Sequence, residues 1–177
     1  NLENSDIAEQ PFVGVFDSKI YLIWVERHNS DNVRKVRLLS RDAAGSGPEA
    51  GGWTRLDGGG VNGLNYDITS DARLPNLLAF NSKLYIGWEE RVSNVRQIRV
   101  AEIVGTVKTH IDGNGSPGIN FGQVIGTCDK CGVKLVEFNS KLYAVWAEVS
   151  TNNNNRRTVH MAEWDGGSGW TFKDGND

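Results

Sequence analysis

Hydrophobic and polar positions alternate along three stretches of the chain that closely resemble one another. They cover residues 16–26, 80–90 and 138–148, and read FDSKIYLIWVE, FNSKLYIGWEE and FNSKLYAVWAE. Their tryptophans, Trp24, Trp88 and Trp146, are 64 and 58 residues apart. A repeat of this length is typical of a solenoid, a propeller or another array of similar units. Because each Trp is flanked by apolar neighbours, we expect all three to be core residues.

Around each stretch the pattern predicts four short strands. Each is rich in aromatic and β-branched residues and is bounded by Gly, Asn, Asp or Pro. No segment shows the period of a helix. The predicted strands are 11–16, 20–26, 33–39 and 52–56 in the first unit, 75–80, 84–90, 95–102 and 107–111 in the second, and 133–138, 142–149, 157–164 and 169–173 in the third. The chain is therefore predicted to be all-β.

Glycine-rich linkers join the units. Each fourth strand ends in Asp-Gly, and the first two linkers then contain Gly63-Leu64-Asn65 and Gly118-Ile119-Asn120. The third linker stops at Asp177, and the opening residues resemble the second half of a linker. We therefore expect residues 1–177 to form a single domain of three whole units, at about 11–57, 75–112 and 133–174.

Four antiparallel strands per unit, joined by Gly-rich linkers, are typical of β-propeller blades. Through the recurring Phe-Asn-Ser-Lys-Leu-Tyr-x-x-Trp, the units resemble blades of bacterial propeller-repeat proteins. Their layout is similar to kelch blades, although the kelch Gly-Gly pair is missing. The segment 164–170, WDGGSGW, also resembles a turn of fucose-binding propeller lectins, some of which build a ring from several short chains. The resemblance implies a propeller and leaves the function open, because propellers carry many activities.

Three blades are too few to close a ring, because propellers typically have 4–8 blades. We therefore expect a homodimer in which two chains meet head to tail and form six blades. The alternative is that these residues are part of a longer propeller chain.

Composition narrows the possible partners. The chain has 177 residues and a net charge of −3, with both signs of charge interspersed. Nucleic-acid binding needs clustered positive charge, so we expect none. No apolar run approaches the ~20 residues of a membrane span, so we expect no membrane insertion. We expect an extracellular or cell-surface protein without a cofactor.

The repeated charged residues are candidates for binding. The hairpin of the second and third strands can set Glu26 against Arg37, and the other blades repeat the arrangement with Glu90 and Arg99 and with Glu148 and His160. Such a pair beside a Trp can bind a sugar, or can be a bridge between packed blades. Repetition in every blade favours the bridge, because a catalytic centre normally occurs once. Trp53 and Trp170 are further candidates for ligand contact.

Residues that break the repeat are the other candidates. Cys128 and Cys131 form a Cys-x-x-Cys motif, which can be half a zinc site, a redox pair or a disulfide in a small loop. Zinc normally has four ligands and the chain has no second pair, so we expect a disulfide and no metal. Lys134 and Glu137 put charge into the first strand of the third unit, and are candidates for lining a central channel.

These features leave three classes of function. The one we favour is a non-catalytic module that binds a glycan or a protein. The alternatives are a structural repeat of an adhesion protein and a propeller-type glycosidase. Because no paired carboxylates or activated nucleophile stand out, we predict that the chain is not an enzyme.

Overall fold

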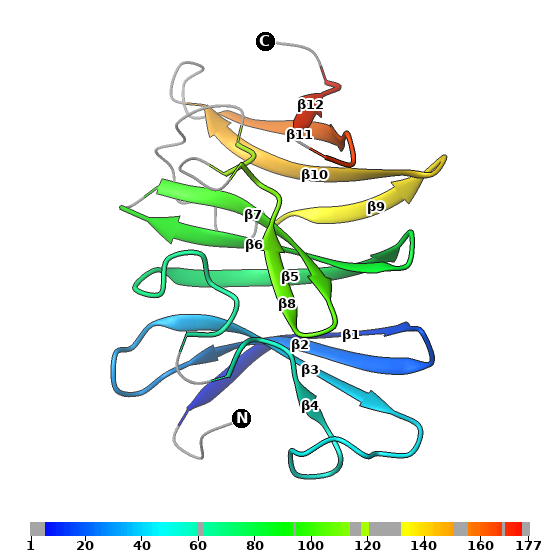
Figure 1. Ribbon diagram of the computed structural model, residues 1–177. Coiled ribbons are helices and arrows are strands. Elements are labelled where there is room, and N and C mark those ends of the chain that lie inside the picture. Colours follow the sequence, from blue (N-terminus) through cyan, green and yellow to red (C-terminus); the bar gives the residue numbers. More distant parts are fainter. Residues whose placement is uncertain are drawn as a thin grey trace.

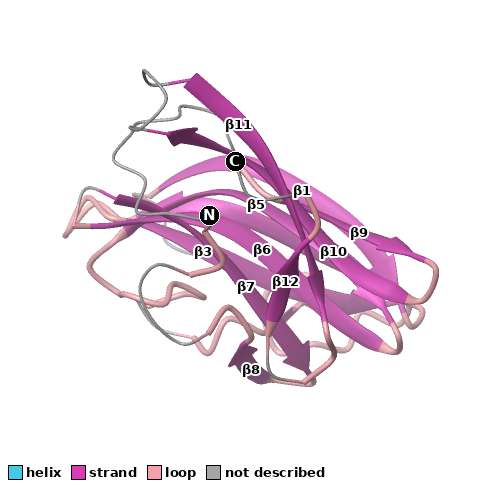
Figure 2. Cartoon of the chain, turned by 90° about the horizontal axis from the view of Figure 1, so that it is seen from above, coloured by secondary structure: helices cyan, strands magenta, loops and turns pink. Residues whose placement is uncertain are grey.

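The computed structural model describes residues 6–59, 62–93, 95–113, 118–120, 132–150, 156–167 and 169–174. Within these residues the chain forms three four-stranded antiparallel sheets and no helix (Figure 2). The sheets are stacked in chain order, with the N-terminal sheet at one end of the stack and the C-terminal sheet at the other (Figure 1). The all-β prediction and the division into three four-stranded blades are confirmed.

We call the sheets blades 1, 2 and 3. Blade 1 contains β1 (Ile7–Phe16), β2 (Lys19–Arg27), β3 (Arg34–Asp42) and β4 (Thr54–Arg55). Blade 2 contains β5 (Asp71–Phe80), β6 (Lys83–Val92), β7 (Val95–Val104) and β8 (Val107–His110). Blade 3 contains β9 (Lys134–Phe138), β10 (Lys141–Ser150), β11 (Arg156–Trp164) and β12 (Trp170–Phe172). The first strands of successive blades contact each other, so β1, β5 and β9 form the inner side of the array.

The repeated turn before each second strand has a conformational cause. Asp17 and Ser18 have φ values of 47° and 57°, and Asn81-Ser82 and Asn139-Ser140 repeat them. A two-residue hairpin of type I′ requires positive φ at both central positions, which Asp and Asn tolerate better than most residues. This turn fixes the register of the first and second strands in every blade.

Strands β1 and β5 begin four residues earlier than the predicted starts at Pro11 and Pro75. A β-bulge interrupts each strand just before its proline, and Gln10 and Leu74 adopt φ values of 54° and 51° there. Proline cannot donate to a regular ladder, but a bulge accommodates it. The Gln10 side chain also accepts a hydrogen bond of 2.7 Å from the Leu74 N–H, which joins the two bulges.

The core lies in two layers between the blades. One layer joins blades 1 and 2 and contains Ile23, Leu38, Ile86 and Trp88, among others. The second layer joins blades 2 and 3 around Trp146. Trp24, Trp88 and Trp146 are all buried, so the prediction that they are core residues is confirmed.

Each linker is fastened to the blade that it leaves. Leu64 donates its N–H to Val36 O at 2.9 Å, and the Asn65 side chain accepts the Val36 N–H at 3.0 Å. Ile119 and Asn120 repeat both bonds on Ile98. The preceding glycine, Gly63, has a φ of +61°, and a Cβ there would lie 2.6 Å from Val36 O. We call Gly63-Leu64-Asn65 and Gly118-Ile119-Asn120 the linker clamps.

Two further predictions concern the cysteine pair and membrane insertion. Cys128 and Cys131 lie outside the described residues, so their disulfide stays a prediction. Within the part of the chain that is described, no helix has the length and apolar character needed to cross a membrane.

Candidate functional site

In each blade an Asp carboxylate contacts an Arg or His of the third strand, and a Glu follows the second-strand tryptophan by two residues. In blade 1, Arg37 Nε lies 3.0 Å from Glu26 Oε2, and Arg37 Nη1 lies 3.4 Å from Asp57 Oδ2. The predicted Glu26–Arg37 pair therefore forms, although it is diagonal, because Arg37 is directly opposite Trp24. Burial raises the pKa of the Asp57 carboxyl, and the Arg37 charge opposes that rise.

Blades 2 and 3 vary this arrangement. Arg99 Nη1 lies 3.5 Å from Asp112 Oδ2, and His160 Nδ1 lies 2.6 Å from Asp174 Oδ2. We call these groups the triads, whose members are Glu26, Arg37 and Asp57 in blade 1, Glu90, Arg99 and Asp112 in blade 2, and Glu148, His160 and Asp174 in blade 3. Asp174 is exposed, and the other eight residues are buried.

The carboxylates of the triads also bind the tryptophans and the linkers. Trp88 Nε1 donates to Glu90 Oε2 at 2.8 Å, and Trp146 Nε1 donates to Glu148 Oε1 at 2.7 Å. Glu90 in addition accepts the N–H groups of Tyr66 and Asp67, in the linker that arrives from blade 1. The triads of blades 1 and 2 are buried, and Glu90 is bonded to the linker backbone, which fits the bridging interpretation, while a role in sugar binding stays a prediction.

The other predicted site residues are spread over the molecule. Trp170 packs between blades 2 and 3, with its ring 5.5 Å from that of Trp164 and its Nε1–H donated to Ile111 O at 2.8 Å. Trp53 is partly buried in the turn before β4. Lys134 and Glu137 are exposed on β9, an inner strand, and their role in a channel stays a prediction.

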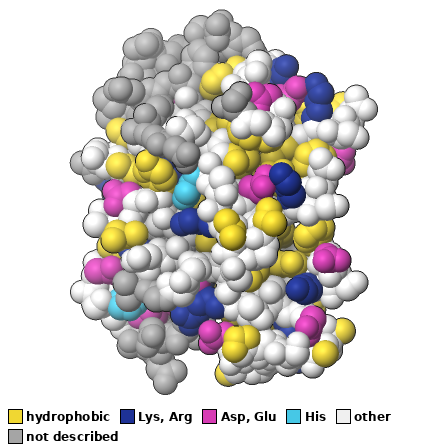
Figure 3. All heavy atoms as spheres, viewed as in Figure 1, with side chains coloured by type: hydrophobic (Ala, Val, Ile, Leu, Met, Phe, Trp, Pro, Cys, Tyr) yellow, Lys and Arg dark blue, Asp and Glu magenta, His cyan; other side chains and the backbone are white. Residues whose placement is uncertain are grey.

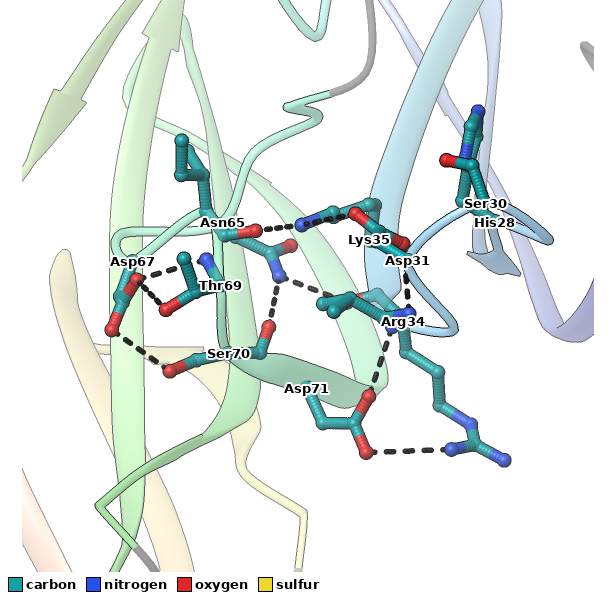
Figure 4. A network of polar contacts seen from close by, with 12 residues as sticks. His28, Ser30, Asp31, Arg34, Lys35, Asn65, Asp67, Thr69, Ser70 and Asp71 are labelled. Atoms are coloured by element: carbon teal, nitrogen blue, oxygen red, sulfur yellow. Dashed lines mark hydrogen bonds and ion pairs between the residues drawn. The ribbon is translucent and has the colours of Figure 1, made fainter.

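A polar cluster that the sequence analysis missed lies between the inner strands of blades 1 and 2. Arg34, at the start of β3, places Nη2 3.4 Å from Glu9 Oε1 and Nη1 3.4 Å from Asp71 Oδ2. Its backbone N–H also donates to Asp71 Oδ1 at 2.9 Å (Figure 4). Arg73 approaches Asp71 at 4.0 Å from the other side. We call Glu9, Arg34, Asp71 and Arg73 the entry cluster, since it lies where β1 and β5 begin.

The entry cluster combines an arginine that recurs in every blade, as Arg34, Arg96 and Arg157, with acidic and basic residues that differ between blades. Glu9 pairs with Val25 and Arg73 with Glu89, so Glu9 and Arg73 occupy the same position of the repeat. By the same alignment, Asp71 stands where blade 1 has Ile7. This departure from the repeat was the available sequence signal. It was missed because the strands were taken to start at the prolines.

An open polar groove of about 410 Å³ adjoins the cluster, lined by Asp67, Thr69, Ser70, Asp71, Arg91 and Ser93. Hydrogen bonds from the backbone and side chain of Thr69 lower the pKa of the Asp67 carboxyl. Lys35 points its Nζ to the linker carbonyl of Ile68, and burial lowers the pKa of that amine. The groove therefore offers carboxylates, hydroxyls and a guanidinium, which are the groups that bind sugar hydroxyls.

The shared contact with Arg34 sets an upper limit on the distance between the two carboxylates of the entry cluster. Because Glu9 and Asp71 contact the two terminal nitrogens of one planar guanidinium, their nearest oxygens are at most about 9 Å apart. Paired carboxylates in glycosidases are ~5–5.5 Å apart in retaining and ~6.5–9.5 Å apart in inverting enzymes. Among the described residues, no group of three or more His, Cys, Asp or Glu is arranged to hold a metal ion.

Comparison with solved structures identifies the fold as that of propeller glycosidases. An α-L-arabinofuranosidase from Lactobacillus brevis aligns with a TM-score of 0.50 and 15% identity, over 94% of this chain and 51% of that one. The GH43_1 enzyme from Xanthomonas citri aligns with a TM-score of 0.50 and 12% identity, over 92% and 52%. This chain thus spans about half the length of these structures. No family model and no curated protein sequence matches it.

These structures correct one prediction and refine another. The prediction that the chain is not an enzyme is contradicted, because the solved propellers that share its fold are glycoside hydrolases. That prediction was based on the lack of paired carboxylates or an activated nucleophile that stood out in the sequence. The propeller resemblance is confirmed at the level of the fold, and the comparisons do not single out kelch repeats or fucose-binding lectins.

Proposed function

We propose that the three blades are part of a propeller glycosidase and that its sugar binds at the entry cluster. The carrying observation is that Glu9 and Asp71, from neighbouring inner strands, contact one guanidinium while remaining partly exposed. Glycoside hydrolysis needs one carboxyl group to protonate the leaving oxygen and a second to attack the sugar or to activate water. Arg34 holds this pair in a fixed orientation, and the adjoining polar groove gives the sugar ring a place to bind.

The proposed substrates are pentose glycosides of the α-L-arabinofuranoside type. The fold of the arabinofuranosidase supports this choice, as does the small size of the polar groove. The face of the molecule seen in Figure 3 carries interspersed charges of both signs, which suits a neutral sugar better than a polyanion.

Hydrolysis of para-nitrophenyl α-L-arabinofuranoside tests the proposal. We expect turnover by the assembled protein and a loss of about 10²-fold or more in kcat in Glu9→Gln and Asp71→Asn, the range seen when an acid or base is removed. Glu102→Gln is the matched control, because Glu102 pairs with Lys83 on blade 2, away from the cluster. Turnover that is equal in all four proteins would place the chemistry elsewhere and overturn the assignment.

A further inference from the structure

Blade 1 and blade 3 each turn one face toward blade 2 and the opposite face away from it. The outward face of blade 1 exposes apolar residues that the other blades bury. Leu77 and Leu135, on β5 and β9, are both 8% exposed, whereas Val13 at the same position of β1 is 60% exposed. Likewise Ile20 is 46% exposed, and its counterpart Leu84 is 2% exposed. We call this surface the blade 1 open face.

The outward face of blade 3 shows the same contrast. Val36 on β3 and Ile98 on β7 are 0% and 3% exposed, because each packs in a core layer with its linker clamp and the next blade. Val159, which holds this position on β11, is 65% exposed, and Val136 on β9 is 44% exposed. We call this surface the blade 3 open face. Its pattern is that of a face on which a following blade packs.

The shapes of the covered faces indicate what fits the open ones. Inside the chain, each leucine of an arriving blade lies over a glycine of the blade before it. A Cβ on Gly14 would lie 2.4 Å from Leu77 Cδ1, and one on Gly87 would lie 2.7 Å from Val133 Cγ1 and 3.3 Å from Leu135 Cγ. Interiors are close-packed, so an added methyl group at either glycine would force a shift.

On the open faces, both the glycine and the leucine of this contact are replaced by valine. Blade 3 has Val136 and Val145 at the positions of Gly14 and Gly87, so its open face has no room for a leucine there. The blade 1 open face presents Val13, which is smaller than the leucine of the other two blades. A smaller projecting side chain against a fuller surface conserves volume, which is what well-packed cores tolerate best.

From this complementarity we infer that the blade 3 open face binds the blade 1 open face of a second copy of this chain. The contact joins two different surfaces, as in the head-to-tail packing of blades 1, 2 and 3 themselves. Two such contacts join two chains into a closed ring. The ring has six blades, within the ~4–8 that propellers typically contain.

Sedimentation equilibrium of the chain at micromolar concentration tests the inference. The expected mass is twice 19.5 kDa. Val13→Asp and Val159→Asp should each give a monomer, because either charge is present in both contacts of a homodimer. Mixing the two variants should restore a two-chain species, because the mixture keeps one unaltered pair of faces. Val107→Asp is the matched control: this exposed valine lies on the middle blade, and its variant should remain a dimer.

Each other outcome would overturn part of the inference. A wild-type monomer would overturn the contact. A Val13→Asp variant that still dimerises would overturn the head-to-tail arrangement, because it would mean that two blade 3 faces bind each other. Large open-ended assemblies would overturn the closed ring. Because Val13 and Val159 are exposed in the single chain, unchanged circular dichroism and melting of the monomeric variants separate loss of contact from loss of fold.

Discussion

The triad of blade 1 and the entry cluster use the same kinds of side chain in different settings. In both, carboxylates flank a guanidinium, as Glu26 and Asp57 flank Arg37 and as Glu9 and Asp71 flank Arg34. The triad residues of blades 1 and 2 are buried, and a corresponding set recurs in blade 3 with only Asp174 exposed, whereas Glu9, Arg34 and Asp71 of the entry cluster are all partly exposed. The difference teaches that repetition with burial favours a structural role, and it is the reason why the proposed sugar site is placed at the exposed cluster.

The largest effect is expected from breaking a triad at its centre. Arg37→Met leaves the Glu26 and Asp57 carboxylates buried without their cation, and removing one partner of a buried ion pair typically destabilises by ~3–5 kcal/mol. Urea denaturation should show this as a lower midpoint. Arg41→Met is the control, because Arg41 is exposed on the same strand. A loss below ~1 kcal/mol in Arg37→Met would mean that the triads do not hold the blades.

A smaller loss of stability is expected when Asn65 is replaced, because Asn65 fastens the linker to blade 1 beside the entry cluster. Its side chain bonds the Val36 N–H and the carbonyls of Arg34 and Ser70, next to the entry cluster (Figure 4). Asn65→Ala leaves buried backbone groups without these partners, at a cost of about 1–3 kcal/mol. Asn120→Ala should cost the same, because Asn120 repeats the clamp on blade 2. Unequal thermal shifts in the two variants would argue against a shared role.

Loss of an ion pair should destabilise the fold much less in the entry cluster than in a triad. Glu9→Gln removes a partly exposed ion pair, and such pairs contribute ~0–1 kcal/mol. We therefore expect a melting temperature close to that of the wild type, together with the loss of turnover described above. If Glu9→Gln unfolded as easily as Arg37→Met, the entry cluster would be a structural group and the contrast would fail.

The smallest effect is expected on the pH dependence of folding stability, through Asp67 in the polar groove beside the entry cluster. The folded-state pKa of Asp67 is lowered by hydrogen bonds from Thr69, so Asp67 stabilises the fold above its unfolded pKa of ~3.9. That contribution is lost as the pH falls from there through the lower folded-state pKa. Asp67→Asn should flatten the stability curve below about pH 4. An unchanged acid limb of the denaturation profile would contradict this assignment.

Local patterns predicted the strands and the hairpins, because alternation and the turn at residues 17–18 are set by neighbours in the chain. They also predicted the Glu26–Arg37 pair, since one hairpin contains both residues. Asp57 was not recognised as its third member, although Asp-Gly recurs after each fourth strand. Local patterns could not predict the entry cluster, for a physical reason. Glu9 and Asp71 meet only because two blades stack, and a bulge shifts the start of each strand.

The linker clamps imply an order in which the molecule can form during synthesis. Asn65 bonds to Val36 and Asn120 to Ile98, so each clamp closes within one repeat behind it. A blade can therefore complete its backbone bonding before the next one leaves the ribosome. Structures dominated by such short-range closures fold quickly compared with other all-β topologies. A growing chain would then lengthen its array one finished blade at a time, with the blade 1 open face and the most recent face open to misassociation.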